Sequence, residues 1–201
     1  VLLLRALILQ NRHDFDSALH DLATLLHQEP TNAQAWLTQA VILQVRARYD
    51  DAQRSCIPLM ELEAPLATST CLASIGSLTV HAAKSYDFLR EALKETQVTS
   101  TDQRLWSLTV LAEIASRIGR YEEADQFFSE ALKFRRPDIY LLNAYADFLL
   151  DQKRPEEVIA MLIVKTRIDS LLLRVALAKQ QLGDNDLPNI VTQLKARFAA
   201  S

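Results

Sequence analysis

Residues 117–138 read RIGRYEEADQFFSEALKFRRPD, and this stretch decides the fold. Gly119 ends one segment with helical periodicity, and a second segment begins directly after it. In that second segment Ala124, Phe128 and Ala131 recur at i, i+4 and i+7, which places them on one face of a helix. The two small residues let a neighbouring helix approach closely, and the phenyl ring fills the space between them. The stretch is therefore expected to be the second half of a helix–turn–helix unit.

Similar sequence segments recur elsewhere in the chain at a regular interval. Ala18 and Ala52 stand at equivalent positions 34 residues apart, and Ala124 and Val158 are separated by the same interval. The longer gap in the middle holds a degenerate copy at 81–95. A period of 34 residues is that of the tetratricopeptide repeat (TPR), whose unit is a pair of helices. The sequence resembles this family over nearly its whole length.

The second and fourth copies carry the family's pattern of large and small residues most fully. In the second copy the matching residues are Trp36, Ala40, Leu43, Tyr49, Ala52, Cys56, Leu59 and Pro65. In the fourth they are Leu108, Leu111, Ala112, Gly119, Tyr121, Ala124, Phe128, Ala131 and Pro137. The resemblance implies an all-α right-handed superhelix, or α-solenoid, with about twelve antiparallel helices. It would form one array over residues 1–201, with six repeats at about 1–31, 32–65, 66–98, 101–136, 137–166 and 167–200.

Two places depart from the family's pattern. Residues 66–80 contain Ser, Thr and Gly76 where better helix formers usually stand, so the first helix of the third repeat is expected to be short or irregular. Pro58 falls inside the second helix of the second repeat, where it predicts a kink or an early end. Near the C-terminus, GDNDLPN at 183–189 offers an N-cap followed by Pro188 in a first helical turn.

Charge and hydropathy exclude some classes of function. The net charge is −3, and no cluster of Lys and Arg dominates the chain, which argues against a nucleic-acid or membrane-surface role. The apolar opening at 1–10 is too short to span a bilayer and contains Arg5. Because the chain begins inside a periodic segment without an initiator Met, we expect a fragment of a longer protein. A cytoplasmic location is favoured, with the periplasm as an open alternative.

The chain contains two cysteines, Cys56 and Cys71, and no CxxC motif. Both stand among apolar neighbours, so two buried free thiols are the default expectation. Because the two residues lie in adjacent predicted elements, a disulfide between them stays an open alternative.

No pattern in the sequence predicts catalysis, a cofactor or a metal site. His13, His20 and His27 are spaced by seven residues, and the rise of roughly 10 Å over two helical turns is too long for one ion to bridge. Acidic pairs recur at the start of second helices, where the helix dipole favours negative charge. These pairs are Asp50–Asp51, Glu122–Glu123 and Glu156–Glu157. We therefore expect a protein that is not an enzyme.

The resemblance places the functional surface on the first helix of each repeat, which lines the concave groove of TPR proteins. The groove positions carried over are Leu37, Val41, Gln44, Trp106, Thr109, Glu113, Tyr140, Asn143 and Asp147. Trp106 and Tyr140 are candidate anchors because such side chains bury large areas at a low cost in entropy. The alternative for Trp106 is that its ring packs into a helix junction.

The function implied is a non-catalytic scaffold that binds a peptide or partner segment of another protein in this groove. Two alternatives stay open. The apolar N-terminal repeat could pair between copies of the chain and make it a self-assembly module. The chain could also be a regulatory or scaffolding segment of a larger enzyme or complex.

Overall fold

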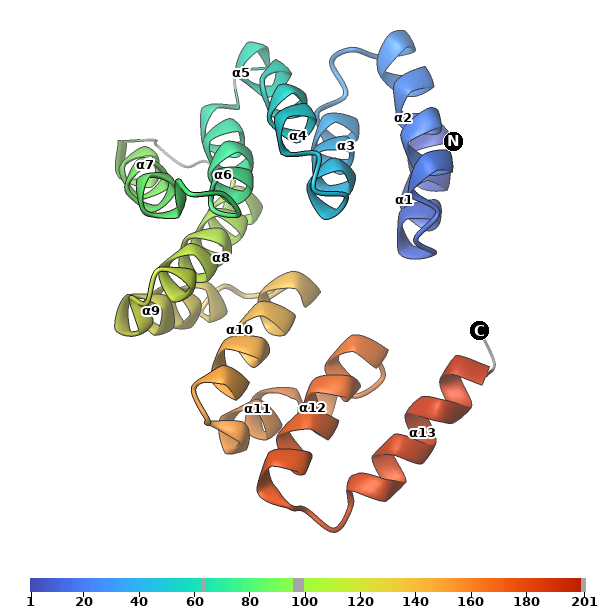
Figure 1. Ribbon diagram of the computed structural model, residues 1–201, viewed down its shortest axis with the longest axis vertical. Helices are drawn as coiled ribbons and strands as arrows, with labels where there is room; N and C mark the ends of the chain where they lie inside the picture. Colours follow the sequence, from blue (N-terminus) through green and yellow to red (C-terminus); the bar gives the residue numbers. More distant parts are fainter. Residues whose placement is uncertain (63, 96–99, 200–201) are drawn as a thin grey trace. The chain divides into compact units, whose positions relative to one another are not determined.

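The computed structural model describes residues 1–62, 64–95 and 100–199, and all regular elements in these ranges are helices (Figure 1). In chain order they are α1 (Leu2–Asn11), α2 (Phe15–Gln28), α3 (Ala33–Val45), α4 (Tyr49–Cys56), α5 (Pro58–Glu61), α6 (Pro65–Gly76), α7 (Ala82–Glu95), α8 (Thr101–Arg117), α9 (Tyr121–Leu132), α10 (Ile139–Asp151), α11 (Pro155–Leu162), the 3-10 turn η1 (Ile163–Lys165), α12 (Asp169–Leu182) and α13 (Leu187–Ala199). The all-α prediction is confirmed.

The chain divides into two compact units, Val1–Arg120 and Tyr121–Ser201, with the boundary between α8 and α9. Within the first unit α1 packs on α2, α3 on α4, and α6 on α7. Within the second unit α10 packs on α11 and α12 on α13. Each unit is thus built from helices that are consecutive in sequence. No helix in the described ranges is long and apolar enough to cross a membrane.

Local sequence signals fix where the helices begin. The side chains of Asp14, Asn32 and Asp138 accept hydrogen bonds from the backbone N–H three residues later, at 3.3, 3.1 and 2.7 Å. These caps satisfy donors that the first turn of a helix leaves without intrahelical partners. The three predicted acidic pairs lie in the first turns of α4, α9 and α11. Pro188 lies in the first turn of α13, as predicted.

The turns inside the hairpins share one backbone conformation. Gly119 and Gly183 adopt positive φ values of 80° and 66°. His13, Ala47 and Lys153 take the same left-handed conformation at φ values near 60°, although each carries a Cβ atom. The predicted end of a helical segment at Gly119 is confirmed, because α8 ends at Arg117.

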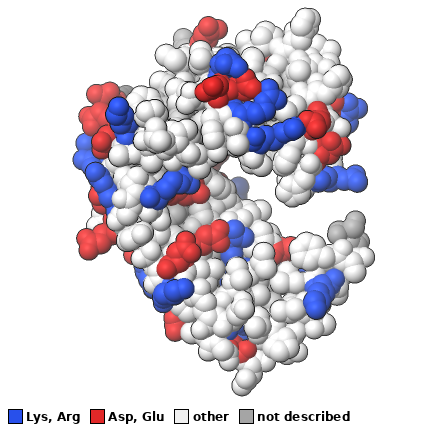
Figure 2. Space-filling model, viewed as in Figure 1, with Lys and Arg blue, Asp and Glu red and all other residues white. Residues whose placement is uncertain are grey.

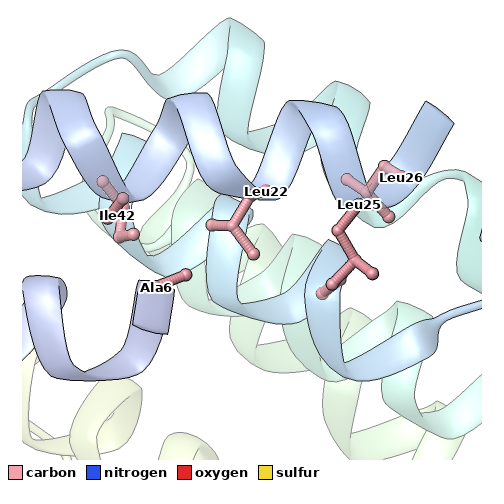
Figure 3. Packing of buried hydrophobic residues seen from close by; sticks show 7 residues of the cluster. Ala6, Leu22, Leu25, Leu26 and Ile42 are labelled. Carbon is pink, nitrogen blue, oxygen red and sulfur yellow. The ribbon is translucent and has the colours of Figure 1, made fainter. Parts of the chain in front are cut away.

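The core at the start of the first unit lies between α1, α2 and α3. Ala6, Leu22 and Ile42 are fully buried, and Leu25 and Leu26 are nearly so. Figure 3 shows Leu22 of α2 directed toward Ala6 of α1. The small Ala6 lets the two helices approach closely, and the branched side chains fill the remaining space at the density of a protein interior.

The second helix of the second repeat is interrupted as Pro58 predicts. The helix α4 ends at Cys56, and α5 begins at Pro58, where the missing N–H is tolerated in a first turn. In contrast, the expectation of a short or irregular helix at 66–80 is wrong, since α6 is a regular helix of 12 residues. The hydroxyls of Thr68 and Thr70 donate to carbonyls four residues earlier, at 3.0 and 2.7 Å, so these polar side chains are satisfied while buried.

Gly76 at the end of α6 faces Ser85 of α7 at short range. A Cβ atom at this position would lie 2.5 Å from Oγ of Ser85 but 3.7 Å from its Cβ. We therefore expect Gly76→Ala to lower the free energy of unfolding by about 1–3 kcal/mol through overpacking. Urea denaturation of Gly76→Ala, Ser85→Ala and the double variant tests this as a cycle. The double variant should recover most of the loss, and equal losses in the single and double variants would contradict the contact.

The default expectation of two free thiols is wrong. Cys56 at the end of α4 and Cys71 within α6 form a disulfide, with their Cα atoms 5.9 Å apart. The two residues are 15 positions apart in the chain. Closing a loop of that length removes conformational entropy from the unfolded chain that corresponds to about 3 kcal/mol. The sequence did not determine whether this disulfide forms, because the order of two helices in the chain does not give the distance between their side chains.

The core of the second unit contains three aromatic rings. Phe128 is fully buried, and its ring centroid lies 4.9 Å from that of Tyr145 and 5.4 Å from that of Phe148. The hydroxyl of Tyr145 donates to Asp125 at 2.8 Å, and burial raises the pKa of this tyrosine. Arg154 also binds Asp125, at 3.0 Å. At the edge of the ring cluster, the polar groups of Tyr145, Asp125 and Arg154 are therefore all hydrogen-bonded or ion-paired.

Acid should destabilise the protein. Hydrogen bonds from Arg154 and Lys179 hold the pKa values of Glu157 and Asp184 below their usual range, and the guanidinium of a nearby arginine does the same for Asp21. The folded chain then binds fewer protons than the unfolded chain between the two pKa values of each group. The stabilisation is nearly complete above about pH 5, where these groups are mostly ionised even in the unfolded chain. It is lost as pH falls through the unfolded values toward the lower folded values.

Melting temperatures between pH 7 and pH 3 test this expectation. The melting temperature should decrease as the pH drops below about 5. An Arg154→Gln variant, which lacks the partner of Glu157, should lose less on acidification. A melting temperature that rises on acidification would contradict the assignment.

Candidate functional site

Three of the predicted groove positions lie along α3 in the first unit. Leu37 is half-buried and packs against the core cluster that contains the disulfide. Val41 is 41% exposed, and Val45 on the next turn is 63% exposed. Gln44 donates from Nε2 to Oγ of Ser74 on α6 at 3.3 Å. This face of α3 therefore offers an exposed apolar strip beside an amide that is already engaged with the next repeat.

Three further predicted positions lie on α8. Trp106 is half-buried and packs against the same disulfide-containing cluster, which favours the helix-junction alternative for its ring. Thr109 is fully buried and its hydroxyl donates to the carbonyl of Leu105 at 2.9 Å, so its expected place on a groove surface is wrong. Glu113 is half-buried.

Polar side chains join the first helices of neighbouring repeats in this unit. The hydroxyls of Thr70 and Ser107 lie 2.8 Å apart in the buried contact of α6 with α8. At the other end of the same contact, Arg117 donates to Oγ of Ser77 at 2.6 Å. These groups hold neighbouring helices in register, because a buried hydroxyl without a partner would be costly. The small polar residues on this face are therefore used in packing.

The other three predicted positions lie on α10 in the second unit. Tyr140 is 39% exposed. Asn143 is half-buried and donates from Nδ2 to Oγ of Ser170 on α12 at 3.2 Å. The carboxylate of Asp147 is 52% exposed and binds the guanidinium of Arg174 at 2.6 Å. Asn143 and Asp147 thus lie on the side of α10 that meets α12, and Tyr140, three residues before Asn143, shares their face of the helix.

Arg174 of α12 connects the two helices of this site through its hydrogen bonds. The sequence pattern did not predict this role. Arg174 donates from its guanidinium to the carbonyls of Asn143 at 3.3 Å and Ser170 at 2.9 Å, as well as to Asp147. Its side chain is only 19% exposed, so its position is well defined by its acceptors. The available signal was the single charged residue within the apolar run LLLRVALA at 171–178.

Contacts of Asn143 and Asp147 with Ser170 and Arg174 join α10 to α12. We term these residues and the exposed residues beside them on the two helices the α10–α12 surface. Arg174 is flanked on α12 by Leu173 and Leu177, which are 44% and 39% exposed. The Oδ1 atom of Asn143 is buried and has no hydrogen-bond partner in the described ranges. The members of the surface are Tyr140, Asn143, Asp147, Ser170, Leu173, Arg174 and Leu177.

Charges elsewhere on the surface are mixed in sign. On the face shown in Figure 2, Lys and Arg side chains lie beside Asp and Glu side chains in several separate places, and much of the remaining surface carries neither. Arg48 and Arg54 both bind Asp51, and this group borders a hollow of about 460 Å³ that also contains Trp36 and Leu43. The charged groups that line the hollow are already paired with one another. Each of them therefore has an ionic partner within the protein.

Known proteins resemble this chain in structure. No protein-family model matches the sequence, and no curated protein matches it. Among solved structures, that of pilF from Pseudomonas aeruginosa aligns with a TM-score of 0.59 at 16% identity, over 100% of this chain and 91% of that one. A tetratricopeptide repeat protein from Parabacteroides merdae aligns with a TM-score of 0.55 at 14% identity, over 97% of this chain and 78% of that one. The fold is that of the tetratricopeptide repeat.

The TPR assignment confirms the α-solenoid of helical repeats predicted from the sequence period. MamA also aligns, at 14% identity over 87% of this chain and 92% of that one, with a TM-score of 0.44. TPR and related solenoids present extended surfaces to which other proteins bind. A shared fold does not by itself imply a function, so the function of this chain has to be argued from its residues.

Proposed function

We propose that this TPR chain is a non-catalytic scaffold that binds a peptide or partner segment of another protein. The observation that carries the proposal is the α10–α12 surface, where exposed apolar side chains flank an ion pair that is fixed by several hydrogen bonds. Tyr and Arg are enriched among the residues that dominate protein interfaces, and both occur here.

The two parts of this surface would contribute differently to binding. Tyr140, Leu173 and Leu177 offer apolar area whose burial would supply most of the affinity. Asp147 is half-exposed and retains acceptor capacity beyond its bond to Arg174, so it can receive an N–H from a bound peptide. Because Arg174 holds Asp147 in place, little entropy would be lost on binding.

The corresponding face of the first unit is a second contact region within the same proposal. Val41 and Val45 form an exposed apolar strip on α3, with Leu37 beside it. Among the residues that the structure describes, no ion pair lies on this strip between Leu37 and Val45, and Gln44 is held by Ser74. We therefore assign specificity to the α10–α12 surface and give α3 a supporting role.

The proposal predicts that Tyr140→Ala combined with Leu177→Ala weakens partner binding at least tenfold, because two exposed apolar side chains are lost. Partners recovered by pull-down with wild-type chain would be identified by mass spectrometry and their affinities measured by calorimetry. The control is Phe198→Ala on α13, which removes an aromatic side chain that is 65% exposed outside this surface. Equal affinity of the double variant and wild type, with circular dichroism unchanged, would contradict the proposal.

Self-assembly is the second candidate function, and exposed residues of α1 favour it. Leu4 and Ile8 are 64% and 50% exposed and lie one helical turn apart. Pairing of these faces between two copies would bury them. Light scattering across protein concentration tests this, since a species that is monomeric throughout contradicts it. A place within a larger enzyme or complex stays a separate proposal that the full-length sequence would test.

A further inference from the structure

We infer that this chain matures in an oxidising compartment, where a thiol–disulfide oxidoreductase installs the bond between Cys56 and Cys71. In this step the thiolate of one cysteine attacks the enzyme's disulfide and forms a mixed disulfide. The thiolate of the second cysteine then attacks that bond. The chain gains an S–S bond and loses two protons and two electrons, and the enzyme's disulfide is reduced to a dithiol. The inference does not depend on the proposed binding function.

The positions of the two cysteines suit a permanent bond. Their Cα atoms are 5.9 Å apart, which is within the usual range for disulfides. Both are carried by helices, α4 and α6, that pack directly on one another. The sequence contains two cysteines, and both are used in the bond. A chain whose cysteines are all paired is typical of oxidising compartments, whereas cytosolic thiols are kept reduced.

Burial determines when the bond can form and whether it can be lost. Cys56 is fully buried and Cys71 is 4% exposed, and both belong to the cluster that includes Leu59 and Ile75. An enzyme's thiol must reach a sulfur atom in order to exchange with it. The bond must therefore form before α4 has packed on α6. Once the helices have packed, the same burial protects the bond from reduction.

The location of the bond gives it a specific structural task. It joins the second and third repeats beside the break at Ile57, where the second helix is divided into α4 with 8 residues and α5 with 4. Helices this short contribute little stability by themselves. The disulfide ties the end of α4 to α6 at the point where the continuous helix of a regular repeat is missing.

The first test measures the redox state in the cells that make the protein. Cells are lysed in acid, and the chain is denatured without reductant so that buried thiols become accessible. Free thiols are blocked with one alkylating reagent, and a second reagent labels the thiols that appear on reduction. Peptide mass spectrometry then reports both cysteines. We expect neither to be labelled before reduction and both to be labelled after it. Full labelling before reduction would overturn the inference.

The second test measures what the bond contributes. Wild-type chain that has been denatured, reduced and refolded with reductant should melt about 6–12 °C below the oxidised chain. The matched control is the Cys56→Ser, Cys71→Ser double variant, whose melting temperature should not respond to reductant. A wild-type melting temperature that is unchanged by reduction would overturn the structural role, and the labelling test stands even if the double variant fails to fold.

Discussion

Phe128→Ala should lower the free energy of unfolding by about 3–5 kcal/mol, because it empties the centre of the aromatic cluster in the second unit. The ring is fully buried and lies against the rings of Tyr145 and Phe148. Its loss leaves a cavity whose walls are fixed by the helices α9 and α10, so only partial collapse can follow. Urea denaturation gives the change in stability, and hydrogen exchange should show the loss of protection in α9 and α10 first.

Phe198→Ala is the matched control for this prediction. It removes the same side chain from a position that is 65% exposed, so its effect should be within about 0.5 kcal/mol. The contrast between the two variants isolates burial, since the chemistry of the deletion is the same. Equal losses at the two positions would contradict the core placement of Phe128.

Trp106→Ala should cost about 3 kcal/mol of stability, because the ring packs against the cluster around the disulfide. The repeat pattern marks this residue as a candidate peptide anchor, and for an anchor a loss of binding in this variant would indicate a direct contact. In the structure the same loss can follow from loosening of α8. Urea denaturation separates the two effects, since an anchor on the surface would change affinity at constant stability.

Tyr140→Ala provides the comparison for Trp106→Ala. Tyr140 is 39% exposed and lies outside the buried cores described above, so its removal should change stability by less than about 1 kcal/mol. A Trp106→Ala chain with wild-type stability and reduced partner affinity would contradict the packing role and return the ring to the binding surface.

Periodicity and helix-end chemistry in the sequence were sufficient to predict the repeats. The spacing of Ala18, Ala52, Ala124 and Val158 predicted the paired helices, because a fully buried apolar residue recurs at this position in the second helix of these repeats. The break at Pro58 was predictable because it follows from one missing N–H and one steric clash. Each of these signals acts within a few residues of the chain, and such signals can be read without knowing the fold.

Apart from the regular geometry of α6, which depends on bonds within that helix, the features that the sequence did not predict depend on contacts between separate helices. The regular geometry of α6 was missed because the helix propensities of Ser and Thr do not include the hydroxyl bonds that satisfy Thr68 and Thr70. Thr109 was predicted to lie on the groove because its position in the repeat matches a groove position of the family. That match does not show whether its side chain is buried here. Arg174 was missed because its acceptors lie on both α10 and α12, and their register is set by packing.

The disulfide also changes how the chain would respond to a protease. Residues 56–71 form a covalently closed ring, with the backbone as one arc and the two sulfur atoms as the other. A single cut in the backbone between the two cysteines opens the ring but leaves both pieces attached. The nicked protein would keep its full mass, apart from one added water, until it is reduced. The most interrupted part of the array is thus the part in which one backbone cut cannot separate the chain into two molecules.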